Sequence, residues 1–228
     1  MSIKVVLLSD FDCEKLSVGK AKVNISGIGK SASTRYEGRR FYLAITDTRF
    51  PFGASAKNEE YRKATKDQWS LQCELSEEQI NVFKNLDERV IDECLNNQEI
   101  VDCLVPKGKK ATKEILESKY FSILKYSKIN QEYPPTIRVT IPNNASDGFN
   151  CSFFSSSLGA FDQIKVNNIP ENADNIGKFL SPRTKGSVLV GMSVWVTNTS
   201  FGVTLRANQI KGETAKQESK KQCLLDLL

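Results

Sequence analysis

Residues 185–211 read KGSVLVGMSVWVTNTSFGVTLRANQIK and hold two β-rich runs on either side of a polar break at residues 197–200. The apolar residues at even positions from 188 to 196 share one face of the first run. The other face carries Leu189, Gly191, Ser193 and Trp195. The second run, residues 201–208, alternates in the same way, and Asn and Ser in the break supply turn chemistry. The stretch therefore predicts a β-hairpin with one apolar face.

The second face of this hairpin carries Trp195, Thr204, Arg206 and Asn208. A planar ring beside cationic and amide groups suits a single nucleic-acid strand, because every base has a π-face and every linkage has a charge. The alternative is that Trp195 is a core residue and Arg206 is a solvated charge. The residues alone leave both interpretations open.

Composition indicates a folded, soluble protein. The chain has 228 residues, of which 39% are hydrophobic and 26% are charged, so it can form one large β-rich domain or two small ones. No apolar run approaches the roughly 18 residues of a membrane span. The N-terminal apolar run of four residues, Val5–Leu8, is followed by acids, which is not the pattern of a secretory signal. We expect an intracellular protein that does not bind a membrane.

The cysteines predict neither disulfides nor a metal site. They are scattered, with no C-x-x-C pair, and the chain has no histidine. In a reducing compartment such residues are mostly small members of the core. The lack of histidine also removes the commonest general base and metal ligand. We expect a non-enzymatic protein without metal or cofactor. The six cysteines are Cys13, Cys73, Cys94, Cys103, Cys151 and Cys223.

Charge is segregated along the chain, although the net charge is only +5. Residues 69–104 hold two basic and nine acidic residues, whereas residues 105–128 hold seven basic and two acidic residues. Residues 1–40 and 169–211 are also basic, at +4 and +3. This distribution favours one side that faces a polyanion and another that faces away. The alternative is that the clusters are only solvated faces.

Two segments resemble nucleotide-binding motifs, but neither has the residues or the length that its motif requires. Gly29-Lys30-Ser31 resembles the end of a P-loop, but the required first glycine falls on Asn24. Residues 27–32 match a loose dinucleotide fingerprint, yet only residues 33–38 separate them from the next strand. That segment is too short for the helix that the fingerprint must open. A mobile loop that touches phosphate explains the lysine and serine better.

The acidic block predicts one amphipathic helix over residues 77–96. Ser76 and Gln79 form a capping box, and apolar residues follow at helical spacing. Its acids should lie on the polar face, away from nucleic acid. Shorter helices are predicted at 111–119 and 171–180.

The rest of the chain predicts short strands, with mobile loops at 27–38 and 51–68. We therefore expect an α+β, β-dominated fold, most simply a small β-barrel with helical additions. The expected strands are 3–8, 20–25, 39–46, 69–74, 120–127, 136–141, 150–154, 161–166 and the two of the hairpin.

The order of motifs resembles a known family. A strand over residues 41–46 precedes Phe50-Pro51-Phe52-Gly53, then Trp69-Ser70-Leu71, the acidic helix and the hairpin. This order is similar to that of the single-stranded-DNA-binding proteins of large cytoplasmic DNA viruses, which are distantly similar to T7-type phage replication proteins. The resemblance covers residues 35–211. It implies an OB-fold-like core, sequence-independent binding of single-stranded DNA, and protection of unwound strands in viral DNA replication, recombination and repair.

The resemblance also implies boundaries, a location and partners. Residues 1–211 would form one OB-like binding domain, residues 212–228 a C-terminal tail, and the protein would work in the host cytoplasm. The phage-type proteins end in an acidic tail that docks replication partners, whereas this tail holds three basic and three acidic residues. Its aliphatic end, Leu224–Leu228, could bind replication proteins, mediate self-association or fold back onto the domain.

Candidate contacts follow from the basic and aromatic residues of the expected loops and strands. Arg39 and Arg40 are adjacent, so only one can face a groove. Phe52 either exposes its ring to bases or plugs the barrel end. Candidate phosphate contacts are Lys30, Arg35, Arg39, Arg40, Lys107, Lys109, Lys110, Lys125, Arg138 and Arg206. Candidate stacking platforms are Tyr36, Phe50, Phe52, Tyr126 and Trp195.

Two other classes of function stay open at this point. The chain could be a non-enzymatic β-rich structural or interaction module of a virion, with basic patches that serve solubility. It could also be a nucleotide-using enzyme, in which case ATP or NAD would raise its melting temperature.

Overall fold

A computed structural model describes residues 3–24, 29–56, 69–128, 133–144, 148–157, 160–164, 176 and 179–213. Within these residues the fold is β-dominated with few helices, as predicted. No helix of this described part is long and apolar enough to cross a membrane.

The predicted hairpin is confirmed and is the longest pairing of the fold. Strands β14 (Thr184–Val196) and β15 (Phe201–Glu213) pair antiparallel from Lys185↔Glu213 to Val196↔Phe201, with a bulge between Leu189 and Val190. The even-numbered residues of β14 are buried along its length. In the turn, Thr197 donates its N–H to the Ser200 carbonyl at 2.8 Å. The alternation seen in the sequence therefore sets which face of the hairpin meets the core.

Five strands join in a ring of pairings. Strand β14 pairs with β4 (Phe41–Phe50), and β15 pairs with β9 (Thr136–Ile141). Strand β6 (Trp69–Glu74) pairs with β9 over its whole length and meets β4 at Arg49↔Glu74. Most of the side chains that face the inside of this ring are apolar and buried. They include Leu43, Ile45, Leu71, Ile137, Val139 and Val190.

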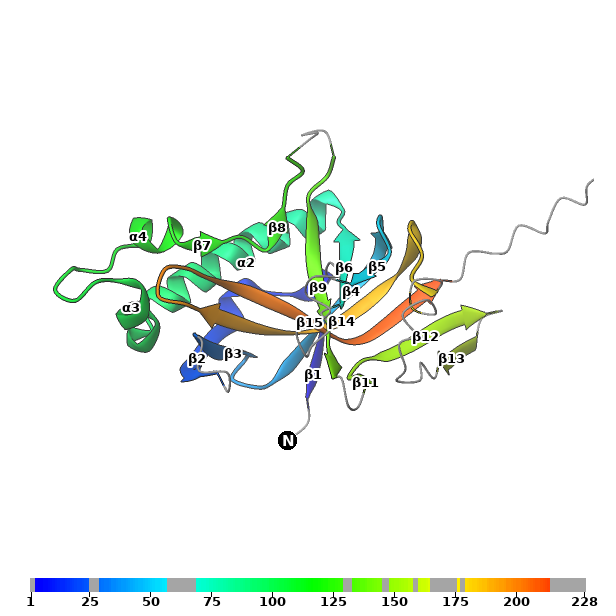
Figure 1. Cartoon of the computed structure of the whole chain (residues 1–228), viewed down its shortest axis with the longest axis horizontal. Helices are drawn as coiled ribbons and strands as arrows, with labels where there is room; N and C mark the ends of the chain where they lie inside the picture. The colour runs from blue at the N-terminus through cyan, green and yellow to red at the C-terminus, as the bar shows by residue number, and fades with distance from the viewer. Residues whose placement is uncertain are drawn as a thin grey trace, which may run out of the picture.

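Further strands extend the ring (Figure 1). Strand β3 (Lys30–Tyr36) pairs with β14, and β2 (Leu16–Val23) pairs with β3. Strand β1 (Lys4–Leu7) lies parallel beside β4, and β12 (Ser152–Ser157) lies parallel beside β15 and pairs with β13 (Ala160–Ile164). The short elements are β5 (Ala54–Ala56), β7 (Tyr120–Phe121), β8 (Leu124–Lys125), β10 (Asn143–Asn144), β11 (Gly148–Phe149), η1 (Leu8–Asp10) and η2 (Cys13–Lys15).

The helices gather at the end of the molecule that holds β2, β3 and the hairpin turn (Figure 1). Helix α2 (Glu77–Leu95) begins with the predicted capping box, in which Ser76 and Gln79 bond each other's backbone N–H groups. It packs against β2, the two 3-10 turns, α3 (Gln98–Leu104) and α4 (Lys113–Glu117). The predicted helix at 111–119 is confirmed in its central part.

Side chains from α2 and α3 cover the outer edge of β2. Glu93 accepts from the Val18 N–H at 3.0 Å, and Glu99 accepts from the Ala21 N–H at 2.8 Å. Asn97 donates to the Gly19 carbonyl at 3.0 Å. These bonds replace the neighbouring strand that an edge strand lacks, which keeps the edge from pairing with another chain.

Three predictions about local structure are wrong. The expected mobile loop at 27–38 is strand β3 from residue 30 to 36, because Ala32, Thr34 and Tyr36 are buried in alternation between two partner strands. Not every acid of α2 lies on the polar face, since Asp87 is buried. Residues 212 and 213 belong to β15 rather than to a tail.

Some predictions lie partly outside the described residues. These are the helix at 171–180, the tail at 212–228 and the mobile loop at 51–68, whose residues 54–56 form strand β5 instead.

Candidate nucleic-acid interface

A groove of about 410 Å³ opens on the side of the sheet that carries Trp195. We call this side of β6, β9, β15, β14, β3 and β2 the outer face. The floor of the groove comes from β6, β9, β14 and β15, and its rim comes from residues 120–125, which we call the groove wall. The groove is lined by Trp69, Ser70, Ser122, Ile123, Lys125, Arg138, Thr140, Trp195, Val203, Thr204 and Leu205.

Trp195 lies across a glycine at one end of the groove. A Cβ atom on Gly202, its cross-strand partner, would meet the Trp195 ring at 2.9 Å, so the ring lies directly on the backbone of β15. The Phe121 ring contacts it at a centroid distance of 5.8 Å and an angle of 45°. Trp195 is half-buried, with one side packed and the other in the groove. The alternative that Trp195 is a core residue is therefore wrong.

Three cations lie on the same outer face. Arg206 pairs with Thr140 of β9, and Lys125 pairs with Thr136 of the same strand. Arg138 lies between these two positions and donates from Nη2 to the Ser70 hydroxyl at 3.1 Å. Because alternate residues of a strand share a face, all three side chains point to the side that holds Trp195. All three are exposed, so each can meet a phosphate.

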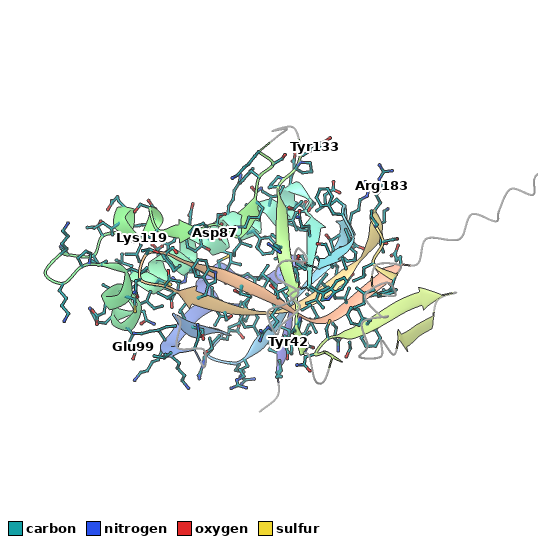
Figure 2. The ribbon with its side chains drawn as sticks, viewed as in Figure 1. Tyr42, Asp87, Glu99, Lys119, Tyr133 and Arg183 are labelled. Atoms are coloured by element: carbon teal, nitrogen blue, oxygen red, sulfur yellow. The ribbon has the colours of Figure 1, made fainter. Side chains whose placement is uncertain are left out.

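A second aromatic residue lies further along the face and was missed from the sequence. Tyr42 accepts at its hydroxyl from the Asn208 amide at 3.2 Å, and its ring lies beside Gly191 (Figure 2). Gly191 is four residues from Trp195 on β14, or about 13 Å along a strand. The signal was available, because alternation along the strand turns Tyr42 away from the side that the apolar neighbours Phe41 and Leu43 share.

The face continues past Trp195 onto β3 and β2. Ser31 pairs with Trp195, and Lys22 pairs with Ser31, which places an exposed lysine on the same face. Arg35 has the same parity as Ser31 and is also exposed. Lys22 was missed because a lysine near a strand end gives no sequence signal of the face it occupies.

Two predicted stacking platforms are wrong. Phe50 is 0% exposed and lies in the core against Gly186, where a Cβ atom would meet its ring at 2.9 Å. Tyr36 is 2% exposed, and its ring lies 5.1 Å from that of Phe11 and 5.6 Å from that of Phe41. Neither ring can reach a base.

The other predicted contacts do not line the groove. Lys30 pairs with Val196 and so shares the buried face of β14, not the outer one. Phe52 is 65% exposed, so it does not plug the barrel end. Their binding roles stay predictions. Besides Arg35 and Arg206 on the outer face, the exposed candidates away from the groove lining are Arg39, Arg40, Phe52, Lys107, Lys109, Lys110 and Tyr126.

The acidic residues lie elsewhere. A separate hollow of about 350 Å³ is lined by Asp12, Glu14, Glu88 and Asp92 from η2 and α2, together with Arg89. Arg89 forms ion pairs with Glu14 and Glu93. The acids of α2 contribute nothing to the groove lining, in agreement with the predicted separation of charge. Among the described residues, no group of three or more Cys, Asp or Glu could hold a metal ion.

Comparisons with known proteins find likeness only among solved structures. No protein-family model matches the chain, and no curated protein matches it significantly in sequence. The single-stranded DNA-binding protein from bacteriophage Enc34 in complex with ssDNA has a TM-score of 0.46 at 10% identity, over 87% of this chain and 95% of that chain. The single-stranded DNA-binding protein encoded by bacteriophage T7 has a TM-score of 0.47 at 8% identity, over 79% of this chain and 96% of that chain.

A C-terminal truncation of the Enc34 protein has a TM-score of 0.45 at 8% identity, over 89% of this chain and 97% of that chain. At these scores the likeness assigns no role to any residue of this chain. The structures are phage proteins, and membership of the family of large DNA viruses stays a prediction.

Proposed function

We propose that the chain binds single-stranded DNA without base specificity along its outer face. The observation that carries this proposal is the Trp195 ring, which lies on the backbone of β15 in a groove beside Lys125 and Arg138. Arg206 and Tyr42 extend the same combination of charge and ring along the hairpin.

The chemistry of this face favours unpaired strands. Stacking of one base on an aromatic ring contributes about 1–3 kcal/mol and is available to every base. A base in a duplex is already stacked between its neighbours and cannot lie on Trp195 without being extruded. Cations that neutralise phosphates add affinity that carries no sequence information. Ring and cation together therefore predict preference for single strands without preference for sequence.

The wider role is also a proposal. The ring formed by β4, β14, β15, β9 and β6 supports an OB-type barrel, the fold that commonly presents such a face to single strands. We propose that the protein is not an enzyme and protects unwound DNA during viral replication, recombination and repair inside the host cell. A second function is not proposed, because no described feature favours one.

Titration of labelled oligo-dT and of a duplex of equal length, followed by fluorescence anisotropy at several salt concentrations, tests the proposal. We expect tighter binding of the single strand and a log-linear loss of affinity with salt, with a slope of about −0.7 per phosphate contacted. Equal weak binding to both, or none, would refute the proposal and favour the non-enzymatic structural module.

A double variant locates the site. Trp195→Ala with Arg206→Ala removes one stacking platform and one cation, so we expect affinity for oligo-dT to fall at least tenfold with the fold intact. The matched control is Tyr133→Ala with Arg183→Ala, which removes an exposed ring and an exposed arginine outside the groove lining. Wild-type affinity in the first double variant would exclude both residues from the site.

A further inference from the structure

A buried carboxylate, that of Asp87, holds the groove wall in place. Among the groove-lining residues, it contacts only residues of the wall. Asp87 lies in the middle of α2 and is 9% exposed. Figure 2 shows it where α2 passes β7. Its oxygens accept from the Tyr120 hydroxyl at 2.6 Å, the Ser122 hydroxyl at 2.5 Å and the Ile123 N–H at 3.1 Å. One side chain thus binds three of four consecutive residues of the wall.

A carboxylate in this position needs those donors. Burial raises the pKa of Asp87, and the hydrogen bonds from Ser122, Tyr120 and Ile123 oppose that rise. Burial also raises the pKa of the Tyr120 hydroxyl, so this group stays a donor. An apolar residue at position 87 would leave all three donors without their acceptor, which explains why the helix carries an acid on its buried side.

Strand pairing alone fixes the wall weakly. Strand β7 has two pairs with β15, and β8 has two pairs with β9, while Ser122 and Ile123 belong to neither strand. Asp87 binds these two unpaired residues. Ser122 in turn helps to fix the positions of Leu124 and Lys125. Its hydroxyl accepts from the Leu124 N–H at 3.1 Å, and its carbonyl accepts from Lys125 Nζ.

The wall in turn positions two groups of the proposed interface. Phe121 lies between the two anchored residues Tyr120 and Ser122, and its ring braces Trp195. Its carbonyl oxygen would lie 2.9 Å from a Cβ atom at Gly202, so the wall also presses on the strand beneath the tryptophan. Lys125 follows directly and lines the groove.

We propose that Asp87 is a positioning residue for the binding of single-stranded DNA, although the groove wall separates it from the proposed DNA path. This inference rests on the proposed function. It assigns Asp87 the task of holding Phe121 against Trp195 and of holding Lys125 at the rim.

Four variants test this role at a temperature where each is shown to be folded by circular dichroism. Asp87→Ala removes the acceptor for all three donors, and we expect about a tenfold loss of affinity for oligo-dT. Tyr120→Phe and Ser122→Ala each remove one bond and should lose less. Asp87→Asn keeps one acceptor and lets the hydroxyls turn to accept, so it should restore part of the affinity.

The matched control is Val90→Ala, which truncates the buried face of the same helix and removes none of the three hydrogen bonds. We expect it to lower the melting temperature but not the affinity. A purely structural role would not change the salt dependence of binding. Loss of the Lys125 contact should reduce the slope by about 0.7 in Asp87→Ala and leave it unchanged in Val90→Ala.

The outcomes separate the two claims. Wild-type protein that binds no single strand refutes the proposed function itself. Wild-type protein that binds, together with Asp87→Ala and Tyr120→Phe variants of wild-type affinity and slope, refutes only the role of Asp87. Weakened binding in these variants but not in Val90→Ala supports both.

Discussion

Gly202 is the position where the smallest possible change should disturb the interface most. A Cβ atom there would lie 2.9 Å from the Phe121 carbonyl oxygen and 2.9 Å from the Trp195 ring. Contacts below 3.0 Å force a shift, and the Phe121 oxygen belongs to the backbone. Overpacking of this kind destabilises by about 1–3 kcal/mol. We expect Gly202→Ala to lower the free energy of unfolding by that amount and to displace the Trp195 ring.

The same face offers a matched control. A Cβ atom on Gly191 would meet the Tyr42 ring at 3.5 Å, which is an ordinary contact. Gly191→Ala should therefore leave stability unchanged or raise it by less than about 1 kcal/mol, because alanine loses less chain entropy on folding. Both variants are measured by urea denaturation and by titration of oligo-dT. Equal effects of the two substitutions, or wild-type stability and affinity in Gly202→Ala, would refute the packing argument.

Three further predictions follow from burial and hydrogen bonding. Burial raises the pKa of Asp87 above its ordinary value of 3.8; its polar and charged neighbours include Tyr120 and Lys125. The folded chain therefore binds a proton at Asp87 more tightly than the unfolded chain does. The contribution of Asp87 to the free energy of unfolding should thus fall as pH rises from about 4 through the raised pKa. Urea denaturation from pH 4 to 7 should show this fall in wild type and not in Asp87→Asn; parallel curves would contradict it. Burial raises the pKa of Cys73 and of Cys94 to about 12, so a thiol reagent at pH 8 should modify neither in the native protein, as peptide mass spectrometry would show. Glu93→Ala with Asn97→Ala uncovers part of the edge of β2, and we expect about 1–3 kcal/mol of destabilisation and self-association in sedimentation experiments; a monomer of unchanged stability would argue against the edge-covering role.

Local patterns were enough to predict the elements with strong periodicity. The hairpin, strands β6 and β9 and helix α2 follow from alternation, turn residues and a capping box. Strand β3 does not, because its two serines and its threonine become strand residues only between β2 and β14. Pairing between distant segments supplies the hydrogen bonds there, and one sequence does not reveal it.

The same distinction explains which residues of the candidate site could be predicted from the sequence. Trp195 and Arg206 were found because the hairpin's own period fixes their face. Tyr36 and Phe50 were misassigned because a ring beside a loop can turn either into the core or out to solvent. Asp87 was placed on the polar side, since helical spacing gives no sign of three donors from a segment more than thirty residues away.

Photo-cross-linking of an iododeoxyuridine-substituted oligo-dT, with mapping of the joined peptides by mass spectrometry, tests the central claim most directly. If single strands lie along the outer face, cross-links should fall on Trp195, Tyr42 and Phe121. If the protein binds the oligonucleotide but cross-links only through exposed aromatic residues elsewhere, such as Phe52 or Tyr133, then DNA does not lie along the outer face.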